Sequence, residues 1–397
     1  MGGQIALRDS LHLDMRGLNG LVWLKPGEMC ARVRAGMRWR ELQELIDGHG
    51  LAVRTMQTYA NFTIGGSVSV NAHGRYVGHG PIARSVRALQ LVLADGSIVE
   101  ASREENDELF RAAIGGYGAL GVITEVELDL DDNTLIARDV VHVPLSEYPE
   151  WFGERVLSDP AALLHNVDLY PAGFDSGDAI TWRRTGQPAT IPDRLHPGHA
   201  RYLGQRSAIW AITELPGGNS LRRHIVVPAQ LEHPEVVWRN YEASLDIASL
   251  EPFSRIVSTY ALEEYFVPMS QFTEFAGALR RILRRRDVEA LNVSIRHSPA
   301  DRESVMAWAR EGVFCFVIYY KQRVLSESLR RVADWTRELI DAAVGLGGSY
   351  YLPYQLHATR EQFERAYPQH AEFRRIKERH DPDGRFSNEM WRKYLGV

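Results

Sequence analysis

The pattern of apolar and polar residues changes its period along the first 130 residues of the chain. Alternation with a period of two predicts short strands, because successive side chains of a strand point to opposite faces. The segments with this period are residues 10–19, 30–36, 86–101, where the turn ADGS separates two strands, and 121–130. Apolar residues three and four positions apart predict helices at residues 39–46 and 106–116. In the second helix, Asn106 is the expected N-cap and Gly115 follows the C-terminal end.

Residues 131–365 have a different pattern, with more tryptophan and tyrosine and fewer glycines. Long amphipathic stretches predict helices at residues 271–286 and 325–345. Apolar runs around them predict strands at residues 256–268, 289–298, 312–321 and 347–354. A sheet with helices on one side would bury such a pattern, so we expect an α+β fold. Residues 177–204 are rich in polar residues and predict a long loop that can act as a mobile lid.

The composition is that of a globular protein, and it limits the partners. The chain has 397 residues, which predicts two domains or one large domain with an insertion. A net charge of -5 argues against a nucleic acid partner. Five arginines between positions 280 and 286 have helical spacing, so we expect them on a solvated helix face. No apolar run is as long as a membrane span and no signal peptide precedes the first strand. We therefore expect a cytoplasmic protein, and peripheral membrane contact stays open.

The cysteines and histidines suggest no metal chemistry. Cys30 and Cys315 lie in apolar, strand-like segments and are expected to be buried free thiols, which fits a reducing compartment. The histidines are scattered and do not have the spacing of metal ligands, so no metal site is predicted.

The segment GGYGALG, residues 115–121, contains the spacing G-x-G-x-x-G at Gly116, Gly118 and Gly121. In a Rossmann fold these glycines follow a strand and open a helix whose N-terminus binds a pyrophosphate. Here the predicted helix precedes the glycines and the predicted strand follows them, so the Rossmann interpretation is rejected. Gly115 as a helix C-cap explains only one of the four glycines. The remaining interpretation is a backbone that comes very close to a flat or charged group.

A second cluster of small residues, TIGGSVSVNAHG, runs from Thr63 to Gly74. Ser67, Ser69 and Asn71 alternate with valines, which places small polar groups on one face and apolar groups on the other. A turn followed by a hairpin would explain this segment taken alone. Two such clusters in one domain favour a large cofactor that lies along the backbone.

Three segments resemble a known family in their order and spacing: TIGGSVSVNAHG, VRALQLVLADGSIVEA and ELFRAAIGGYGALGVITEVEL. The family is the FAD-binding domain of the vanillyl-alcohol oxidase superfamily, also called the PCMH type. The C-terminal HDPDGRFSNEMWRKYLG resembles the closing segment of its sugar-lactone and alditol oxidase branch. GGSYYLPYQLHATREQFERAYP is similar to the decaprenylphosphoryl-ribose oxidases.

The resemblance implies an α+β fold of two domains, a PCMH-type FAD-binding domain and a cap domain with an antiparallel sheet covered by helices. It places the FAD-binding domain at residues 1–130, the substrate or cap domain at residues 131–365, and a C-terminal segment that returns to the FAD domain at residues 366–397. The opening MGGQIALRDSLHLDMRGLN resembles the end of a glycine-rich turn, just after a histidine–serine pair that often bonds covalently to the flavin. Gly2, Gly3 and Gln4 would be its last residues. We therefore expect an incomplete N-terminal lobe, a partly missing pyrophosphate cradle and FAD that is bound non-covalently.

The resemblance also implies which residues contact FAD. The first cluster would wrap the pyrophosphate and the flavin, with a histidine–glycine pair beside the flavin ring, and the second would contact the ribityl chain and adenine. The implied cofactor-binding residues are Thr63, Ile64, Gly65, Gly66, Ser67, Asn71, His73, Gly74, Gly116, Gly118, Gly121, Val122, Ile123 and Asn388. A turn histidine is the alternative for His73.

Oxidation of a CH–OH group requires an acceptor for the hydroxyl proton and donors that fix the substrate. In LEEYFVP, Glu264 shares a strand face with Phe266 and is the predicted substrate-facing acid, with an exposed strand carboxylate as the alternative. The related alditol oxidases have Glu-x-Arg where this chain has Ser294 and Arg296. The arginine is kept and can bind flavin charge or a substrate oxygen, but the missing acid weakens the case for an identical substrate.

Two further strand segments offer candidates. Tyr319 or Lys321 is expected to face the site, but not Tyr320 as well, and Lys321 is a predicted catalytic residue. Tyr354, also a predicted catalytic residue, stands where the ribose oxidases have a lysine. A tyrosine titrates at about 10, so Tyr354 is a weak base unless its surroundings change its pKa. His357 is a second candidate in the same segment, with a loop histidine as the alternative.

Together these features predict an FAD-dependent oxidoreductase that oxidises a CH–OH group of a carbohydrate-like alcohol or lactone by hydride transfer to the flavin. Oxygen or another acceptor would reoxidise the flavin. Two alternatives stay open, a flavin-dependent reductase of a C=C bond and a non-catalytic remnant with an incomplete flavin site.

Overall fold

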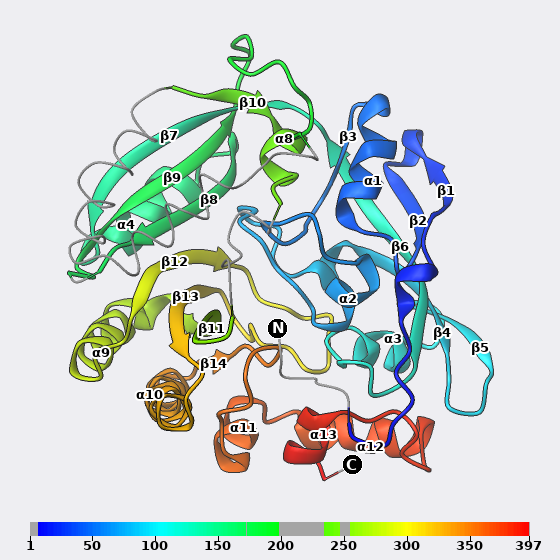
Figure 1. Cartoon of the computed structure of the whole chain (residues 1–397). Coiled ribbons are helices and arrows are strands. Elements are labelled where there is room, and N and C mark those ends of the chain that lie inside the picture. The colour runs from blue at the N-terminus through cyan, green and yellow to red at the C-terminus, as the bar shows by residue number, and fades with distance from the viewer. Residues whose placement is uncertain (1–6, 172, 198–233, 247–254, 397) are drawn as a thin grey trace.

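The computed structural model describes residues 7–171, 173–197, 234–246 and 255–396, which form two antiparallel sheets with helices around them (Figure 1). The smaller sheet has the strand order β1-β2-β6-β4-β5, and β3 also pairs with β6. Its strands are β1 (Leu21–Lys25), β2 (Cys30–Arg34), β3 (Leu51–Val53), β4 (Val86–Val92), β5 (Ile98–Ser102) and β6 (Val122–Asp132).

Three short helices accompany this sheet: α1 (Trp39–Ile46), α2 (Ile64–Ser69) and α3 (Asp107–Ala113). Trp39, Leu42 and Ile46 form the buried face of α1, as their spacing predicts. Helix α3 precedes the glycine segment and β6 follows it. The order of elements that excludes a Rossmann site is thus confirmed.

The larger sheet has the strand order β10-β7-β9-β8-β12-β13-β11-β14. Its strands are β7 (Leu135–Pro144), β8 (Ala162–Leu169), β9 (Ser176–Arg184), β10 (Val236–Trp238), β11 (Ser258–Pro268), β12 (Ala290–Ser298), β13 (Val313–Arg323) and β14 (Ser349–Tyr350). The helices of this part are α4 (Tyr148–Phe152), α8 (Arg239–Ala243), α9 (Phe272–Arg285) and α10 (Ser326–Gly345). The C-terminal helices are α11 (Arg360–Ala366), α12 (His370–His380) and α13 (Glu389–Tyr394).

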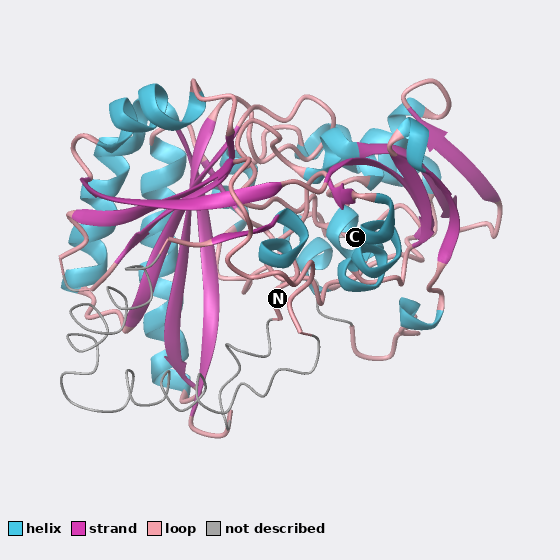
Figure 2. Cartoon of the chain, turned by 90° about the horizontal axis from the view of Figure 1, so that it is seen from above, coloured by secondary structure: helices cyan, strands magenta, loops and turns pink. Residues whose placement is uncertain are grey.

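Strand β13 shows how the larger sheet divides its two faces. Phe314 and Phe316 pack on Phe272 and Phe275 of α9, with each pair of ring centroids 4.9 Å apart. Cys315, between them, points to the opposite face, which meets the smaller-sheet half of the molecule. Figure 2 shows helices along the outer side of the larger sheet. The predicted α+β fold, with a cap sheet covered by helices, is confirmed.

Some expectations about individual elements are wrong. Residues 10–19 form no strand: a 3-10 helix occupies Met15–Gly17 and the first strand begins at Leu21. Residues 10–19, all of which the structure describes, belong to neither sheet, and Leu11 is 88% exposed. The alternation after Thr63 belongs to helix α2, in which Ile64 and Val68 are four positions apart and both fully buried.

The expected polar loop at residues 177–204 is in part a strand. Residues up to Arg184 belong to β9. Buried and half-buried positions largely alternate along this strand, although many of its residues are polar. Residues 198–204 lie outside the described residues. Asn106 precedes α3 but does not cap it through its side chain, which instead donates to the Glu100 carbonyl.

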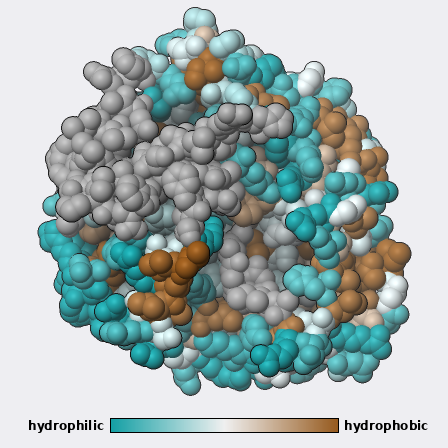
Figure 3. All heavy atoms as spheres, viewed as in Figure 1, coloured by the Kyte–Doolittle hydropathy of each residue, from teal (hydrophilic) through white to brown (hydrophobic). Residues whose placement is uncertain are grey.

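The surface and the thiols agree with the composition. Cys30 and Cys315 are buried and free. On the face shown in Figure 3, hydrophilic residues cover much of the described surface, and apolar residues form separate patches. Within the described part of the chain, no helix has the length and apolar character needed to cross a membrane.

A buried cation holds the C-terminal helices to the first half of the chain. Lys377 of α12 donates to the Ala119 carbonyl at 2.9 Å and to the Phe386 carbonyl at 2.7 Å. It also pairs with Asp381 at 2.7 Å, and both side chains are almost fully buried. Lys377 therefore ties α12 to the loop that contains the second glycine cluster.

We predict that Lys377→Met lowers the free energy of unfolding by about 3 kcal/mol, because it leaves the Asp381 carboxylate buried without its cation. Urea unfolding followed by tryptophan fluorescence measures this. Arg379→Met is the matched control, since Arg379 is 63% exposed and pairs with Glu108 at the surface. It should cost less than about 1 kcal/mol, and equal losses for the two variants would contradict the assignment.

Candidate functional site

The two clusters of small residues lie side by side. The Gly115 amide donates to the Val68 carbonyl at 3.1 Å, and the Tyr117 amide donates to the Ser69 carbonyl at 2.9 Å. These bonds join the end of α2 to the loop between α3 and β6. Two segments separated by about fifty residues of sequence thus form one continuous backbone surface.

Close packing explains part of the glycine content. A Cβ on Gly65 would lie 2.6 Å from the Cβ of Ala35, so any side chain there would push the two segments apart. Gly118 has a positive φ of +73° and open space where a Cβ would lie, so its backbone conformation, rather than crowding, favours glycine. Packing and backbone conformation therefore explain some of these glycines without any ligand.

A cavity of about 610 Å³ opens where the two clusters meet. Its size is within the range of small-molecule and cofactor sites. Nine predicted cofactor-binding residues line it: Thr63, Gly65, Gly66, Gly116, Gly118, Gly121, Val122, Ile123 and Asn388. Ser69 and Tyr117, which were not in the predicted set, line it as well, and so does Arg392, for which some flavin contact was expected together with Asn388.

The other predicted cofactor residues lie behind this lining. Ile64 is fully buried, and the Ser67 hydroxyl bonds to Gln57 and to the Thr63 carbonyl at 2.9 Å each. The Asn71 amide donates to Asp301 at 2.7 Å and to Ser304 at 3.1 Å. The side chains of Ser67 and Asn71 are therefore engaged within the protein, and a cofactor role for them stays a prediction. Gly74 packs against the backbone at Met56.

The chemistry of the lining fits an anionic nucleotide cofactor. Among the described residues, the amides of Gly66 and Gly118 donate to no protein acceptor, and both border the cavity. Arg392 brings a positive charge to the same lining from α13. Free amides and an arginine are the donors that bind phosphate groups in proteins. Asn388 is itself fixed, because it donates to the Tyr117 carbonyl at 2.9 Å.

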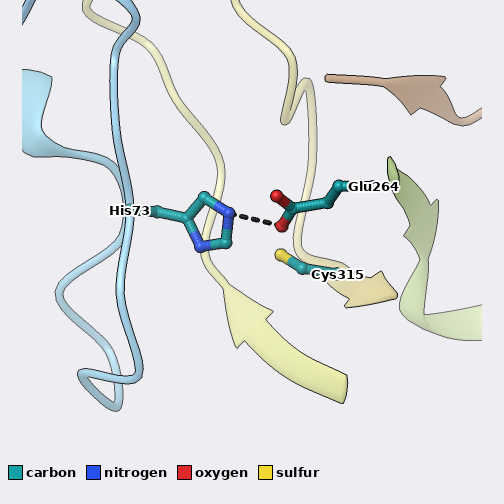
Figure 4. A group of neighbouring side chains, drawn as sticks. All are labelled: His73, Glu264 and Cys315. Carbon is teal, nitrogen blue, oxygen red and sulfur yellow. Dashed lines mark hydrogen bonds and ion pairs between the residues drawn. The ribbon is translucent and has the colours of Figure 1, made fainter. Parts of the chain in front are cut away.

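A buried cluster of side chains lies on the inner face of the larger sheet, and it is drawn in Figure 4. His73 Nε2 and Glu264 Oε1 are 2.5 Å apart, and their side chains are 4% and 3% exposed. The Tyr354 hydroxyl donates to Glu264 Oε2 at 3.4 Å. Glu264 is thus neither exposed nor isolated, and His73 is not a free turn histidine.

Aromatic residues enclose this cluster. The His73 ring lies 5.0 Å from Trp308, 5.7 Å from Phe266 and 6.0 Å from Tyr351, measured between centroids. Burial raises the pKa of Tyr354 well above its ordinary value, and the charge of Glu264 adds to the effect while Arg296 opposes it. Tyr354 therefore stays protonated and acts as a hydrogen-bond donor rather than a base.

Three side chains of the cluster are potential metal ligands, although the scattered histidines in the sequence do not indicate a metal site. Ligand atoms of His73, Glu264 and Cys315 all lie within 4.8 Å of one another. Burial raises the pKa of the Cys315 thiol well above its ordinary value, so the thiol is not prepared to bind a cation as thiolate. His73 and Glu264 already satisfy each other through their hydrogen bond.

The remaining predicted residues occupy different places. Arg296 on β12 lies opposite Cys315, so it belongs to the same sheet face as the cluster. Lys321 pairs with Glu289 at 3.8 Å, and its register partner Tyr260 is four residues from Glu264, roughly 13 Å along the strand. His357 bonds to Gln355 at 2.8 Å. The structure thus joins Glu264, Tyr354 and Arg296 on one face but separates Lys321 from them.

Tyr117 is the aromatic residue of the second glycine cluster. It lines the cavity, and burial raises its pKa well above its ordinary value, with smaller contributions from Tyr367, Tyr354 and Glu264. Sequence reasoning missed this residue although it stands inside GGYGALG. Trp308 and Tyr351 carry no local signal, because only the meeting of the two halves brings them to His73.

Two family models match the chain. One is described as an FAD binding domain and matches residues 1–102, and the other, D-arabinono-1,4-lactone oxidase, matches residues 235–394. An alditol oxidase from a Streptomyces species is 33% identical over 178 residues, which cover 42% of this chain and 40% of the relative.

Two other relatives align over nearly the whole chain. L-gulonolactone oxidase of Mus musculus is 24% identical over 98% of this chain and 86% of its own length. Decaprenylphosphoryl-beta-D-ribose oxidase of Mycolicibacterium smegmatis is 23% identical over 96% of this chain and 84% of its own length.

We predict that Ser69→Phe lowers the affinity for FAD at least tenfold, because Ser69 lines the cavity and an aromatic ring there takes up space that the cofactor needs. Titration of the flavin-free protein with FAD, followed by flavin fluorescence, measures the affinity. Ser69→Ala is the control, since it removes only a hydroxyl and leaves the cavity open. Unchanged affinity in the phenylalanine variant would show that FAD does not use this cavity.

Proposed function

From the premise that the chain belongs to the PCMH-type aldonolactone oxidase family of FAD-dependent oxidoreductases, we propose that it oxidises a CH–OH group of a carbohydrate-like alcohol or lactone. The observation that carries the proposal is the buried pair of His73 and Glu264, because His73 follows the cavity-lining Ser69 by four residues in the same segment. A carboxylate that is fixed by a histidine next to the cofactor site supplies the acceptor that alcohol oxidation requires.

The roles of the chain's own residues follow from the contacts of Glu264. Its Oε1 is fixed by His73, whereas Oε2 receives only the long bond from Tyr354 among the described residues. Oε2 is therefore the atom that accepts the hydroxyl proton of the substrate. Tyr354, which stays protonated, donates a hydrogen bond to Glu264 or to the substrate oxygen, and the aromatic residues around His73 exclude water.

The cavity lining supports a site for FAD. The amides of Gly66 and Gly118 and the guanidinium of Arg392 would hold the pyrophosphate, and Asn388 would fix the loop that carries Tyr117. FAD supplies the hydride acceptor when it is bound. Oxygen is the proposed final acceptor, because the named relatives are oxidases.

We propose further that FAD is held without a covalent bond. His12 is the histidine of the described lining, and it is exposed on a segment outside any helix or strand. Acid precipitation of the reconstituted protein should leave the flavin in the supernatant, where absorbance at the flavin maximum measures it. Flavin that stays with the precipitate would contradict this part of the proposal.

We predict that Glu264→Gln slows the anaerobic reduction of the bound flavin by an alcohol or lactone about 100-fold or more, with FAD affinity unchanged, because the proton acceptor is lost. Stopped-flow bleaching of the flavin measures the rate, with xylitol, L-gulono-1,4-lactone and D-arabinono-1,4-lactone as the first substrates.

Glu263→Gln is the matched control for this experiment. Glu263 is the adjacent residue on β11 and faces the helices, where burial raises its pKa well above its ordinary value. Its side chain lies on the sheet face opposite that of Glu264, so its replacement should leave the rate unchanged. Equal rates for Glu264→Gln and the parent protein would remove Glu264 from the proposed role.

A further inference from the structure

The placement of Arg296 raises the question of what its charge binds. In the strand register Arg296 pairs with Cys315 on β13, and Cys315 pairs with Phe266 on β11. Phe266 and Glu264 are two positions apart on β11 and so share that face. Arg296 and Glu264 thus lie on one sheet face with a strand between them, roughly 12 Å apart at the backbone, and a small ligand can reach both side chains.

Arg296 has no anionic partner in the part of the chain that the structure describes. Its Nε is buried and donates no hydrogen bond. Two other cations of this part of the molecule do have acidic partners: Arg75 pairs with Glu242 at 2.7 Å, and Lys321 pairs with Glu289 at 3.8 Å. Ser294, two positions earlier on the same face, contributes a hydroxyl, and Asp168 of β8, its register partner and likewise a described residue, forms no ion pair with Arg296.

Arg296 is half-buried with its Nε shielded from solvent, and without an ion pair the hydration lost by this part of the guanidinium is not repaid. A ligand carboxylate repays it through two parallel hydrogen bonds, which match the planar fork of arginine. A single free cation balances a monoanion and not the dianion of a phosphate ester. Glu264 does not fill this role, because it is already bonded to His73 and Tyr354.

We propose that the substrate is a hydroxy acid or sugar acid whose carboxylate binds Arg296 while its hydroxyl faces Glu264. This inference rests on the proposed oxidation and specifies its substrate class. The carboxylate is unchanged in the reaction: the carbinol C–H leaves as hydride to FAD, the hydroxyl proton passes to Glu264, and the product is an oxo acid.

Binding is tested without turnover. The FAD-loaded protein is titrated by calorimetry with 2-hydroxy-2-methylpropanoate, which has no carbinol hydrogen and cannot be oxidised, and with its neutral amide. We expect the acid to bind at least tenfold more tightly than the amide. Arg296→Gln should weaken binding of the acid about 10- to 100-fold and leave binding of the amide unchanged.

Two further variants separate charge from folding. Arg296→Lys keeps the charge but loses the fork, so it should retain part of the preference for the acid. Arg284→Gln removes the same charge from α9, on the opposite face of the sheet, and should change neither affinity. Equal binding of acid and amide by the parent protein, or equal losses for both ligands in Arg296→Gln, would overturn the proposal.

The second experiment measures reduction of the bound flavin by acids and by neutral polyols. Gluconate is compared with glucitol, and glycerate with glycerol, and the acid of each pair should bleach the flavin faster in an Arg296-dependent way. A shift of the flavin reduction potential in Arg296→Gln, with an unchanged acid-to-amide affinity ratio, would assign the guanidinium to the flavin and overturn the proposal.

The binding titration and the flavin reduction together distinguish failure of this inference from failure of the proposed function. Arg296-dependent binding of the acid without bleaching by any alcohol would leave the carboxylate site in place and remove the oxidation. Bleaching by neutral polyols and acids alike would keep the oxidation and remove the carboxylate site.

Discussion

The structure depends on the direct contact between two backbone segments, the end of α2 and the loop before β6. Their amides and carbonyls are joined at Gly115–Val68 and Tyr117–Ser69, at distances that side chains in between would not permit. This contact builds one wall of the cavity and fixes where α2 ends. His73, a few residues further along, is thereby directed to the inner face of the larger sheet.

The site itself belongs to both halves of the molecule. His73 comes from the half with the smaller sheet and Glu264 from β11 of the larger sheet, so their hydrogen bond exists only when the two halves are packed. Cap residues secure that packing through the backbone: Trp308 donates to the Asn71 carbonyl at 3.0 Å and Tyr351 to the Val70 carbonyl at 2.9 Å. Cofactor site and proton acceptor are therefore coupled by the same contacts.

Strand alternation explains why two adjacent acids have different properties. Glu264 meets His73 on the inner face, while Glu263 faces the helices with one carboxyl oxygen unpartnered among the described residues, and burial raises its pKa well above its ordinary value. The family models match residues 1–102 and 235–394, so the second glycine cluster lies outside both matches. It is the three-dimensional contact with α2 that assigns this segment to the same site.

The sequence by itself determined the features that depend on local order: the helix before the glycines and the strand after them, the faces of β11 and β12, and the long helices of the cap. It misjudged α2 and β9, because six residues of alternating pattern or a polar composition fit more than one element. Only the tertiary structure decided that Lys321 pairs with Glu289, that His73 meets Glu264, and that Arg296 finds no anionic partner within the described ranges. The physical reason is that pairing between charges depends on distances across strands and domains, which no local pattern encodes.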